Sequence, residues 1–417
     1  MSSEKLKYGL LGEKLGHSFS PVIHYKLGIS DYRLIETDGE NLKNVLCDRC
    51  YGGFNITIPY KREAMKLCDE IDDEAKEIGC VNTIVREKDG RLFGYNTDIN
   101  GFIYMARRAD INFNGRKTLI LGSGGTSLTV QKAARRLGAS RITVISRSGE
   151  VTYERLRDYA DSEIIVNTTP VGMYPDNLES LVRVGDFPNC TGVVDVIYNP
   201  RRTVILMDAE RLGIPCTDGL PMLVYQAKRA QELFLRKSIP DSEAERVIRE
   251  LRAESGNIVL IGMPGSGKST VARLIADRTG KKLVDIDTEI EKTAGKTIPA
   301  IFEGDGENVF REFEREETAK AGKLTGMVIA AGGGVVKDMR NYASLRQNGR
   351  IYCICREIDK LDIKGRPLSK SKETLYSLQR EREPLYRLFA DVFVDNNAEP
   401  EVAAERILED YYENISD

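Results

Sequence analysis

The chain contains no tryptophan, only two histidines and no long apolar run. A helix that crosses a membrane needs about 20 mostly apolar residues, and no stretch approaches that length, so no membrane segment is predicted. Charge of one sign is not in excess either, because 61 lysines and arginines stand against 64 aspartates and glutamates, for a net charge of −3. Nucleic acid and anionic membrane surfaces are therefore not expected as partners.

Residues that could hold a structural metal are scarce. Cys47-Asp-Arg-Cys50 has the spacing of a zinc or redox pair, but no second pair follows it and the histidines are limited to His17 and His24. We therefore expect no metal or redox role there. The N-terminal residues are polar and lack an apolar targeting core. Eight cysteines without a targeting segment predict reduced thiols and a cytoplasmic protein.

The length and composition indicate several cores. At 417 residues, with 41% hydrophobic and 30% charged side chains, the chain is expected to form two or three globular domains. Apolar strand-like runs alternate with helical stretches, which indicates an α/β architecture with mainly parallel sheets. The strand-like runs before residue 250 are Tyr8–Leu11, Gly53–Ile58, Lys117–Leu121, Arg141–Ile145, Glu163–Val166 and Gly192–Ile197.

Breaks in this pattern predict the domain boundaries. After Pro240, residues 241–245 have the pattern of a helix start, and this helix is expected to run to about Ala253. Glu254-Ser-Gly-Asn257 then separates the helix from the next strand. A further division is expected between residues 101 and 114. We therefore predict domains over 1–105, 106–254 and 255–417, with the last helices of the second domain returning to the first.

One run has a specific chemical meaning. Gly262-Met-Pro-Gly-Ser-Gly267-Lys268-Ser269 follows the apolar segment 258–261, as a phosphate-binding loop follows a buried strand. Its glycines let backbone N–H groups face a triphosphate, the Lys268 ammonium reaches the outer phosphates, and the Ser269 hydroxyl can ligate Mg²⁺. The next helix adds the positive end of its dipole. We predict that ATP or a similar nucleotide is bound by Gly265, Ser266, Gly267, Lys268, Ser269 and Thr270.

A second glycine-rich turn lies in the middle of the chain. Leu119-Ile-Leu-Gly122-Ser-Gly124-Gly125-Thr-Ser127 reads as a strand, a turn and a helix expected over Leu128–Leu137, the order of a dinucleotide-binding unit. Ser127 stands where that pattern expects glycine or alanine. The next strand ends in Ser146-Arg147-Ser148, where an NAD site would need Asp or Glu, whereas an arginine between hydroxyls suits a 2′-phosphate. NADP is therefore favoured over NAD.

Seven motifs of the first 250 residues occur together and in one order. They are Gly12-Glu-Lys-Leu-Gly-His17-Ser18-Phe-Ser20-Pro21, Gly53-Phe-Asn55-Ile-Thr57-Ile-Pro59-Tyr-Lys61, Gly79-Cys-Val-Asn82-Thr83, Gly94-Tyr-Asn96-Thr97-Asp98, Asn167-Thr168-Thr169-Pro170-Val-Gly172-Met173, Asp195-Val-Ile-Tyr198-Asn-Pro200 and Asp218-Gly219-Leu-Pro-Met222-Leu-Val-Tyr-Gln226. In these motifs and in their order, the segment resembles the shikimate dehydrogenase family. It departs from that family in Ser146-Arg-Ser148, where Asn-Arg-Thr is usual, and in lacking the family's C-terminal tryptophan.

The resemblance implies a hydride-transfer site. Reduction of a ring ketone needs a proton donor beside the developing alkoxide, and a Lys–Asp pair can supply and orient one. By resemblance, Lys61 is the general acid/base and Asp98 its partner, and both also bind ring hydroxyls. Taken singly, each residue fits a plainer reading better: Lys61 a solvated lysine after a turn, Asp98 a turn residue, and Ser18 and Ser20 helix caps before Pro21. Taken together and in this order, the motifs favour the site.

The family also implies a role for the other polar residues of these motifs. The substrate carboxylate is assigned to Ser18 and Ser20, and the remaining polar edge to Thr57, Asn82, Gln226 and the nearby Tyr198. The cofactor pyrophosphate is assigned to Gly122, Gly124 and Gly125, the adenosine phosphate to Ser146, Arg147 and Ser148, and the surroundings of the nicotinamide to Thr168, Val196 and Gly219. The family's chemistry gives no proton transfer to His17 or His24, so both are expected to be structural.

The last 160 residues carry polar groups of another kind. Asp285-Ile-Asp287 ends the strand expected after the phosphate loop, and the alternation of side chains along a strand predicts both carboxylates on one side. The motifs Phe310-Arg311-Glu-Phe-Glu314, Ala331-Gly332-Gly333-Gly334-Val335, Gly365-Arg366-Pro367-Leu368 and Arg382-Glu-Pro-Leu-Tyr386 follow. With these motifs, residues 257–417 resemble shikimate kinase over their whole length.

This second resemblance assigns a role to each charged group. Asp285 joins Ser269 on the metal side, while Asp287 binds the acceptor and takes its proton. Planar guanidinium forks suit a carboxylate, and phosphoryl transfer needs positioning and charge neutralisation, which Lys268 also supplies. The remaining assignments are the carboxylate clamp of Arg311 and Arg382, the substrate contact of Gly333 and the lid arginine Arg366 over the phosphates.

Both halves call for the same kind of ligand, a small hydroxylated ring carboxylate. The resemblances imply a bifunctional enzyme that reduces 3-dehydroshikimate to shikimate with NADPH and then phosphorylates shikimate with MgATP. The fold class implied is α/β, with a substrate domain and a Rossmann-type NADP domain, followed by a P-loop domain like that of nucleoside monophosphate kinases. The sequence leaves the oligomeric state open.

Two alternatives remain. One is an NAD-linked quinate or shikimate dehydrogenase in the first half. The other is a sensor or scaffold built from degenerate enzyme domains, which would have lost catalytic groups. Against the second alternative, the catalytic groups are all present: Lys61, Asp98, Lys268, Asp285 and Asp287.

Overall fold

The computed structural model describes residues 6–16, 18–361 and 372–415. By its contacts the chain forms two compact units. The first unit takes the chain up to Met173 together with Glu179–Ile248, and the second takes Tyr174–Leu178 together with the chain from Arg249 onward. The single-residue boundaries proposed from the sequence stay predictions.

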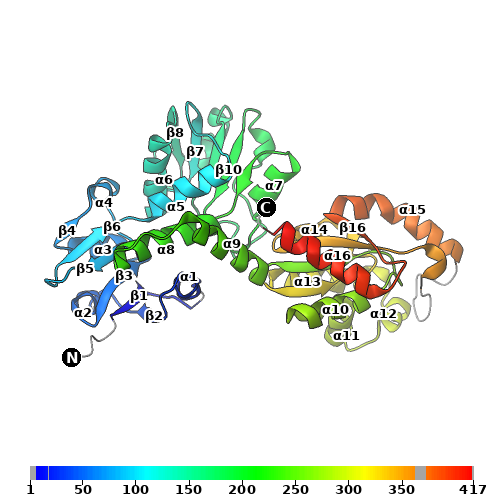
Figure 1. Cartoon of the computed structure of the whole chain (residues 1–417). Coiled ribbons are helices and arrows are strands. Elements are labelled where there is room, and N and C mark those ends of the chain that lie inside the picture. The colour runs from blue at the N-terminus through cyan, green and yellow to red at the C-terminus, as the bar shows by residue number, and fades with distance from the viewer. Residues whose placement is uncertain (1–5, 17, 362–371, 416–417) are drawn as a thin grey trace. The chain divides into compact units, whose positions relative to one another are not determined.

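The first sheet of the first unit has the strand order β2-β1-β3-β5-β6-β4 (Figure 1). Its strands are β1 Lys7–Gly12, β2 Tyr32–Glu36, β3 Tyr51–Ile56, β4 Glu70–Ile71, β5 Thr83–Arg86 and β6 Leu92–Tyr95. Its helices are α1 Ser20–Lys26, α2 Leu42–Cys47, α3 Lys61–Lys66 and α4 Asp73–Ile78. All pairs are parallel except those of β5, which runs antiparallel to β3 and to β6. Mainly parallel pairing is therefore confirmed, with β5 as the exception.

The second sheet of the first unit is parallel throughout, in the order β11-β10-β9-β7-β8. Its strands are β7 Lys117–Leu121, β8 Arg141–Ile145, β9 Ile164–Asn167, β10 Gly192–Asp195 and β11 Cys216–Thr217. The accompanying helices are α5 Asp98–Arg108, α6 Gly125–Arg136, η1 Tyr153–Tyr159, η2 Val184–Asp186, α7 Val204–Arg211, α8 Leu220–Leu235 and α9 Asp241–Ser255. Helix α8 packs against α5 and also reaches α1, β3 and β5 of the first sheet.

Side chains along β7 point alternately to the two faces of this sheet, and helices cover both faces. Ile120 packs with Phe102 of α5 and the helix α6, whereas Leu119 and Leu121 pack on the opposite side with Ile205 of α7. A strand that is buried on both faces reads as a continuous apolar run, as β7 does. Helices on both faces of a parallel sheet form the Rossmann-type arrangement that the sequence predicts.

The second unit contains one parallel sheet in the order β13-β14-β12-β15-β16. Its strands are β12 Asn257–Ile261, β13 Lys282–Asp285, β14 Met327–Ala330, β15 Gly349–Cys355 and β16 Val392–Asp395. Its helices are α10 Lys268–Thr279, α11 Ile286–Ala294, α12 Ile298–Gly304, α13 Glu307–Lys323, η3 Val335–Lys337, α14 Met339–Arg346, η4 Ile358–Lys360, α15 Lys372–Phe389 and α16 Pro400–Glu413. The strand before the phosphate loop, β12, is central, and its Val259 and Leu260 face two different cores.

One local prediction is wrong. Asp285 and Asp287 do not share a strand, because β13 ends at Asp285 and α11 begins at the next residue. Asp285 is the N-cap of α11 and accepts a hydrogen bond from the Thr288 N–H at 3.2 Å. Aspartate is among the preferred N-cap residues, and here this capping ends the strand. Asp287 therefore lies in the first turn of a helix.

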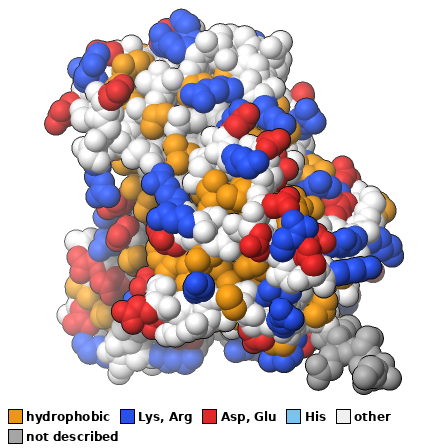
Figure 2. Space-filling model, turned by 90° about the vertical axis from the view of Figure 1, so that its left-hand side faces the viewer, with side chains coloured by type: hydrophobic (Ala, Val, Ile, Leu, Met, Phe, Trp, Pro, Cys, Tyr) orange, Lys and Arg blue, Asp and Glu red, His pale blue; other side chains and the backbone are white. Residues whose placement is uncertain are grey.

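The surface carries both signs of charge. Figure 2 shows Lys and Arg side chains interspersed with Asp and Glu over the face that it draws, with hydrophobic side chains exposed between them. Within the described part of the chain, no helix combines the length and the apolar character that a membrane span requires.

Candidate active sites

A cavity of about 260 Å³ in the first unit is lined by segments of both its sheets and by α8. It gathers ten of the residues that the sequence predicts for substrate or cofactor: Ser18, Ser20, Thr57, Lys61, Asn82, Asp98, Val196, Tyr198, Gly219 and Gln226. The predicted phosphate-binding segments 122–125 and 146–148 do not line it. Residues from distant motifs thus meet at one place, and their individual roles stay predictions.

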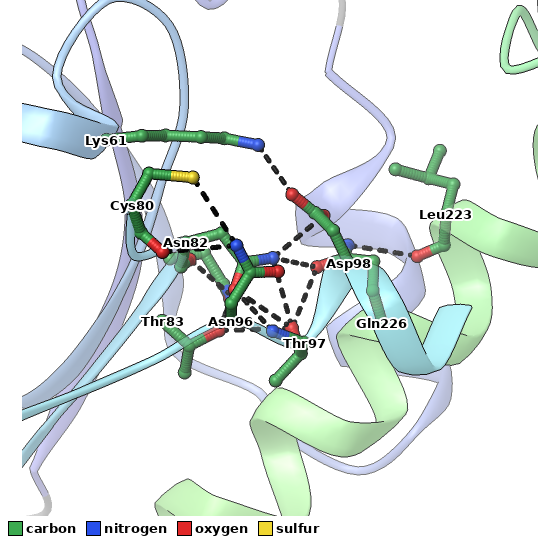
Figure 3. Close-up of polar contacts among 10 residues, drawn as sticks. Lys61, Cys80, Asn82, Thr83, Asn96, Thr97, Asp98, Leu223 and Gln226 are labelled. Atoms are coloured by element: carbon green, nitrogen blue, oxygen red, sulfur yellow. Dashed lines mark hydrogen bonds and ion pairs between the residues drawn. The ribbon is translucent and has the colours of Figure 1, made fainter. Parts of the chain in front are cut away.

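Lys61 and Asp98 form an ion pair in this cavity, with Nζ and Oδ2 2.6 Å apart (Figure 3). Helix α3 begins at Lys61 and α5 begins at Asp98, so two helix starts present the pair. Burial by itself would lower the pKa of the Lys61 ammonium, but the Asp98 carboxylate outweighs it and the pKa is raised. Lys61 is therefore protonated at neutral pH and can donate a proton to an oxygen that gains negative charge beside it.

Asn82 fixes the other oxygen of Asp98. Its Nδ2 donates to Asp98 Oδ1 at 2.8 Å, and its Oδ1 accepts from the Thr97 backbone N–H at 2.7 Å (Figure 3). Gln226 Oε1 lies 3.4 Å from both Asn82 Nδ2 and Thr97 Oγ1. Because both carboxylate oxygens of Asp98 are engaged, the side chain is held toward Lys61. Thr97 belongs to a quoted motif, but no feature of that motif singled it out.

Ser18 and Ser20 lie at the start of α1. Phe19 is the N-cap residue of this helix and makes no side-chain capping hydrogen bond, but the hydroxyl of Ser18 accepts from the first N–H of the helix, so the alternative capping role stays open for Ser18. Ser18 Oγ accepts from the Ser20 backbone N–H at 3.2 Å and donates to Ser20 Oγ at 3.1 Å. Two adjacent hydroxyls that face a cavity suit an anionic oxygen, as the predicted carboxylate contact requires.

The predicted dinucleotide loop joins β7 to α6. Gly122 has φ of +102°, and a Cβ there would lie 2.8 Å from the Thr169 side chain and 2.9 Å from that of Thr168, so a side chain does not fit. Helix α6 begins at Gly125 with Gly124 as its N-cap, which makes the predicted start at Leu128 wrong. The free N–H groups and positive dipole end of α6 therefore lie at the glycines, where a pyrophosphate can bind.

The segment 146–148 follows β8. Arg147 is exposed and makes neither a hydrogen bond nor an ion pair with any described residue. Ser148 is also exposed, whereas Ser146 is buried and its Oγ finds no partner in the part of the chain that the structure describes. Thr168, a predicted nicotinamide contact, donates through Oγ1 to the Leu121 carbonyl at 2.7 Å. Arg147 is thus the group most available to a 2′-phosphate.

Asp195, at the end of β10, is fully buried and joins two loops. Its carboxylate accepts from Asn167 Nδ2 at 3.1 and 3.2 Å, from Thr203 Oγ1 at 2.6 Å and from the Ile197 N–H at 3.0 Å. Burial raises the pKa of Asp195 to about 6, against the effect of these hydrogen bonds. Thr168 and Val196, which directly follow Asn167 and Asp195, are predicted nicotinamide contacts. The sequence placed Asp195 in a motif without a role, because its burial could not be read there.

Asp195→Asn is expected to change how the stability of the first unit depends on pH. Because folding raises the pKa from 3.8 to about 6, the folded state binds an extra proton between these values, and stability falls as pH rises through them. Over this range the free energy of unfolding falls by about 3 kcal/mol in total, because each pKa unit corresponds to roughly 1.36 kcal/mol. The variant should lack this contribution. Pulsed hydrogen exchange of β9 and β10 across a urea series, at acidic and at neutral pH, measures it, and identical pH dependence in both proteins would contradict it.

His24 is buried and hydrogen-bonded within the first unit. Its Nδ1 lies 3.0 Å from Gln231 Oε1 and its Nε2 lies 3.1 Å from Asn55 Oδ1. Burial lowers the pKa of His24 to about 4, so the ring is neutral at physiological pH. The structural role expected for His24 agrees with these contacts, and His17 lies outside the described residues.

In the second unit, the phosphate loop joins β12 to α10. Gly262, Gly265 and Gly267 have φ values of +142°, +81° and +92°, which side chains rarely adopt. A Cβ at Gly262 would lie 2.5 Å from the Ile354 carbonyl oxygen, and one at Gly267 would lie 2.5 Å from Asn396 Nδ2. Glycine is thus required at positions 262 and 267 for two reasons: the positive φ, and a neighbouring atom that leaves no room for a Cβ.

The Lys268 ammonium lies inside this loop. Its Nζ donates to the carbonyl oxygens of Gly262 and Met263, at 2.9 Å each. Ser266 is fully buried, and its Oγ has no partner among the described residues. Ser269 and Thr270 are exposed at the start of α10. The loop therefore already holds the lysine where outer phosphates would bind.

Ser269 and Asp285 meet beside the loop. Ser269 Oγ donates to Asp285 Oδ2 at 2.9 Å. Mg²⁺ at nucleotide sites binds through one or two carboxylates, several waters and the phosphates, so a hydroxyl and a carboxylate in contact fit such an ion. No cluster of three or more acidic, histidine or cysteine side chains is gathered for a metal in the described ranges.

The predicted acceptor site surrounds the glycines 332–334. A Cβ at Gly332 would lie 2.7 Å from Asp287 Oδ1 and 3.0 Å from Glu314 Oε1, and one at Gly334 would overlap the Arg311 guanidinium. Arg311 Nη1 in turn donates to Glu314 Oε2 at 2.7 Å. The glycines thus let Asp287 and Arg311 approach the same stretch of backbone, although they come from different helices.

Arg382, on α15, is only 1% exposed although it stands in a charged stretch of sequence. Its Nη1 donates to the Gly333 carbonyl at 2.7 Å, as does the Tyr386 hydroxyl. Arg382 Nε and Nη2, like Glu314 Oε1, are buried and find no partner within residues 6–16, 18–361 and 372–415. A buried guanidinium with unpaired donors is costly, and a carboxylate ligand would satisfy it.

One neighbour of the acceptor site has no role in the sequence-based prediction, and one predicted residue is not described. Glu314 contacts Arg311 and borders the glycines, yet the sequence assigns it no role. Burial raises the pKa of Glu314 despite the adjacent Arg311. The predicted lid arginine, Arg366, lies outside the described residues.

Two family models match the chain. The shikimate dehydrogenase substrate binding domain matches residues 10–84, which lie in the first unit. Shikimate kinase matches residues 264–412, from the phosphate loop to α16, and so takes in every element around Asp287 and Arg382.

Relatives of the first unit extend the match to both of its sheets. Shikimate dehydrogenase (NADP(+)) of Clostridium perfringens (strain 13 / Type A) is 37% identical over 268 residues, which cover 59% of this chain and 98% of that protein. The crystal structure of a chorismate mutase/shikimate 5-dehydrogenase fusion protein from Clostridium acetobutylicum is 35% identical, with a TM-score of 0.56, and covers 59% of this chain and 97% of that one. The crystal structure of shikimate 5-dehydrogenase from Thermus thermophilus in complex with NADP(H) and shikimate is 31% identical, with a TM-score of 0.53. The match covers 59% of this chain and 99% of that one.

The Clostridium perfringens relative is matched almost from end to end, so the likeness includes the parallel sheet β7–β11 as well as the cavity around Lys61. The kinase match includes the phosphate loop from Pro264 onward and the glycines 332–334. The chain therefore belongs to the shikimate dehydrogenase family through its N-terminal part, and it carries a shikimate kinase domain after it.

Proposed function

We propose that the chain is a bifunctional enzyme of the shikimate pathway. Its first unit interconverts 3-dehydroshikimate and shikimate with NADP(H), and its second unit phosphorylates shikimate to shikimate 3-phosphate with MgATP. One observation carries the proposal. A single chain contains both the partly buried Lys61–Asp98 ion pair and a phosphate loop together with the buried Arg382, two of whose guanidinium nitrogens have no partner among the described residues.

In the first reaction, NADPH supplies the hydride that forms the new C–H bond at the carbonyl carbon. Lys61 gives its proton to the carbonyl oxygen and is left as a neutral amine, which takes a proton back from solvent. Asp98 holds the ammonium at 2.6 Å and stabilises its charge before the transfer. Ser18 and Ser20 bind the ring carboxylate and so fix which ring carbon lies beside Lys61.

In the second reaction, ATP supplies the phosphoryl group that the 3-hydroxyl of shikimate accepts. Asp287 orients this hydroxyl and takes its proton, while Arg311 and Arg382 hold the carboxylate. Lys268 neutralises charge on the outer phosphates, where such a contact acts mainly in the transition state. Ser269 and Asp285 would hold Mg²⁺, which would neutralise negative charge on the phosphates.

Two assays on the purified full-length chain test the proposal. Shikimate with NADP⁺ should produce NADPH, and shikimate with MgATP should produce ADP and shikimate 3-phosphate. With 3-dehydroshikimate, NADPH and MgATP together, shikimate 3-phosphate should accumulate. Failure of either single assay would overturn the corresponding half.

Arg147→Ala is expected to raise the KM for NADP⁺ about 10-fold or more and to leave that for NAD⁺ unchanged. The guanidinium is exposed and has no competing partner among the described residues, and a hydrogen bond to a charged group contributes about 1.5–3 kcal/mol. Initial rates with both cofactors measure it.

Arg155→Ala is the matched control for Arg147, because Arg155 is also exposed but pairs with Asp158 at 3.0 Å. Equal losses with NADP⁺ and NAD⁺ in the Arg147 variant would contradict a 2′-phosphate contact. Faster oxidation with NAD⁺ than with NADP⁺ by the unsubstituted protein would assign the first unit to the NAD-linked alternative.

A further inference from the structure

A second cavity of the first unit, of about 580 Å³, is larger than the one around Lys61. It is lined by α5, by the end of α6, by α8 and by the start of α9. Its main polar side chains are Asn100, Tyr104, Arg107, Arg136, Tyr225 and Arg229. Cavities of about 300–1,000 Å³ are typical of small-molecule sites, and none of these six residues lines the cavity that contains Lys61.

Three guanidinium groups from three helices surround this cavity. Arg136 of α6 pairs with Glu74, and Arg229 of α8 pairs with Glu232. Arg107 of α5 is exposed and pairs with no residue in the described ranges. The cavity therefore holds one positive charge that the surrounding protein does not neutralise.

The acidic side chain of the cavity is already engaged. Asp241 lies 2.6 Å from Lys228 Nζ and accepts a hydrogen bond from the Tyr225 hydroxyl at 3.2 Å. Lys228 also lies 3.2 Å from Glu232. Asp241 thus does little to repel an anion that binds to the arginines.

One wall of the cavity is flat and apolar. The rings of Tyr104 and Tyr225 are stacked, with centroids 4.0 Å apart and an angle of 12° between their planes. The Tyr104 hydroxyl bonds to Glu245, and the Tyr225 hydroxyl to Asp241, so neither ring can swing away. Ile103 and Leu137 add further apolar surface.

We propose that this cavity binds a small organic oxyanion, which is a phosphate ester or a carboxylate attached to a flat ring. The guanidinium forks bind either group through paired N–H donors, and the ring lies against the tyrosines and Ile103. An inorganic ion alone would leave most of the volume and the apolar wall unused.

An occupant of this cavity also bears on the dehydrogenase site. Asn100 lies two residues after Asp98 on α5, and Tyr225 directly precedes Gln226 on α8. The two cavities thus use different faces of the same two helices. A ligand that shifts either helix changes the position of Asp98 or Gln226, and the coupling is reciprocal. We therefore infer that the site is regulatory, an inference that rests on the proposed dehydrogenase activity.

Calorimetric titration of the full-length chain with phenyl phosphate tests the site. Saturating NADP⁺ and MgADP are present, so that the nucleotide sites cannot take the probe. We expect a Kd of about 1 mM or tighter, which is reasonable for a ligand of this size. The double variant Arg107→Met/Arg229→Met should bind at least about 10-fold more weakly, whereas Arg211→Met, an exposed arginine away from the cavity, should bind as the unsubstituted chain does.

Two further probes identify the group that is recognised. Benzoate binding in place of phenyl phosphate would indicate a carboxylate ligand, and inorganic phosphate should bind more weakly than either because it lacks the ring. Absence of binding by both organic probes, or equal binding to the double variant, would overturn the site. Equal binding of inorganic phosphate would overturn the ring contact.

The proposed coupling between the two cavities is tested by a separate kinetic measurement. Saturating probe should change the KM for shikimate in the dehydrogenase assay, and the double variant should have near-normal kinetics that the probe does not alter. An unchanged KM at saturating probe would overturn the coupling, whereas an inactive unsubstituted chain would overturn the proposed function and leave the calorimetric result standing. Neither measurement depends on the assignment of the kinase reaction.

Discussion

Lys61→Met should lower kcat for shikimate oxidation by about 10²–10⁴-fold, while the kinase activity of the same molecule stays unchanged. Methionine retains the length and apolar stem of lysine but cannot carry a proton. Asp98 loses its counter-charge at 2.6 Å, yet Asn82 still donates to its other oxygen, so the carboxylate keeps its place. Initial rates with NADP⁺ and with MgATP on one preparation measure both activities.

The pH dependence of the two directions provides a second test of Lys61. Its pKa is raised because the Asp98 carboxylate outweighs the effect of burial, so at neutral pH nearly all of it is ammonium. Ketone reduction needs the ammonium and should be insensitive to pH near neutrality, falling only when Lys61 loses its proton. Alcohol oxidation needs the neutral amine and should become faster as pH rises toward that point. Both dependences should disappear in the methionine variant.

Lys117→Met is the matched control for Lys61. Lys117 also forms an ion pair with a 2.6 Å distance, to Asp161, but it lies on β7 away from the cavity. Its loss should leave kcat within about twofold, because partly exposed pairs contribute little to stability. Similar losses of activity in both variants would mean that Lys61 acts on folding and not on chemistry.

The regular elements could be predicted where burial on both faces produces a continuous apolar run. β7 matches the predicted residues for this reason, because its buried run is visible without knowledge of the neighbouring elements. β8 also matches, although only Ile145 is buried there, because its run of β-branched residues favours a strand. The errors lie at helix starts. Asp285 ends β13 by capping α11, and α6 starts at Gly125, earlier than the apolar residues that mark its buried face. The Asp285 cap depends on one side-chain hydrogen bond, whereas the Gly124 cap makes none, and periodicity reveals neither of them.

The sites could be predicted where a motif carries the chemistry in its own residues. Lys268 is predicted from its own motif, and Lys61 and Asp98 are predicted from a resemblance that their motifs carry. The structure places each of the three in a pocket or loop that suits its predicted role, and the roles stay predictions. Glu314 and Asp195 were missed because their importance comes from burial and from partners distant in sequence. Even for predicted residues the environment was hidden, since nothing in the charged stretch around Arg382 indicates a side chain that is 1% exposed.

Lys268→Met is expected to lower kcat of the kinase by about 10²–10³-fold, the usual effect of removing one charge-stabilising donor from a transition state. The ammonium now bonds to the carbonyl oxygens of Gly262 and Met263, so it is held inside the loop before any phosphate arrives. The loop shape should survive its loss, because the positive φ values of Gly262, Gly265 and Gly267 do not depend on the lysine. The KM for shikimate should therefore change little, and dehydrogenase activity not at all. Initial rates of ADP formation over a shikimate series measure both constants.

Lys281→Met separates this effect from the loss of a buried lysine. Lys281 Nζ also donates to backbone carbonyls, those of Ala253, Glu254 and Gly256, at 2.8 Å, 3.1 Å and 3.0 Å, and burial lowers its pKa to about 8. These acceptors belong to the end of α9 and the turn before β12, so Lys281 has no contact with the phosphate loop. Lys281→Met should lower the stability of the second unit by about 1–3 kcal/mol and leave kcat intact. A kinase that loses activity equally in both variants would show that Lys268 supports the fold, because a transition-state contact predicts loss in Lys268→Met alone.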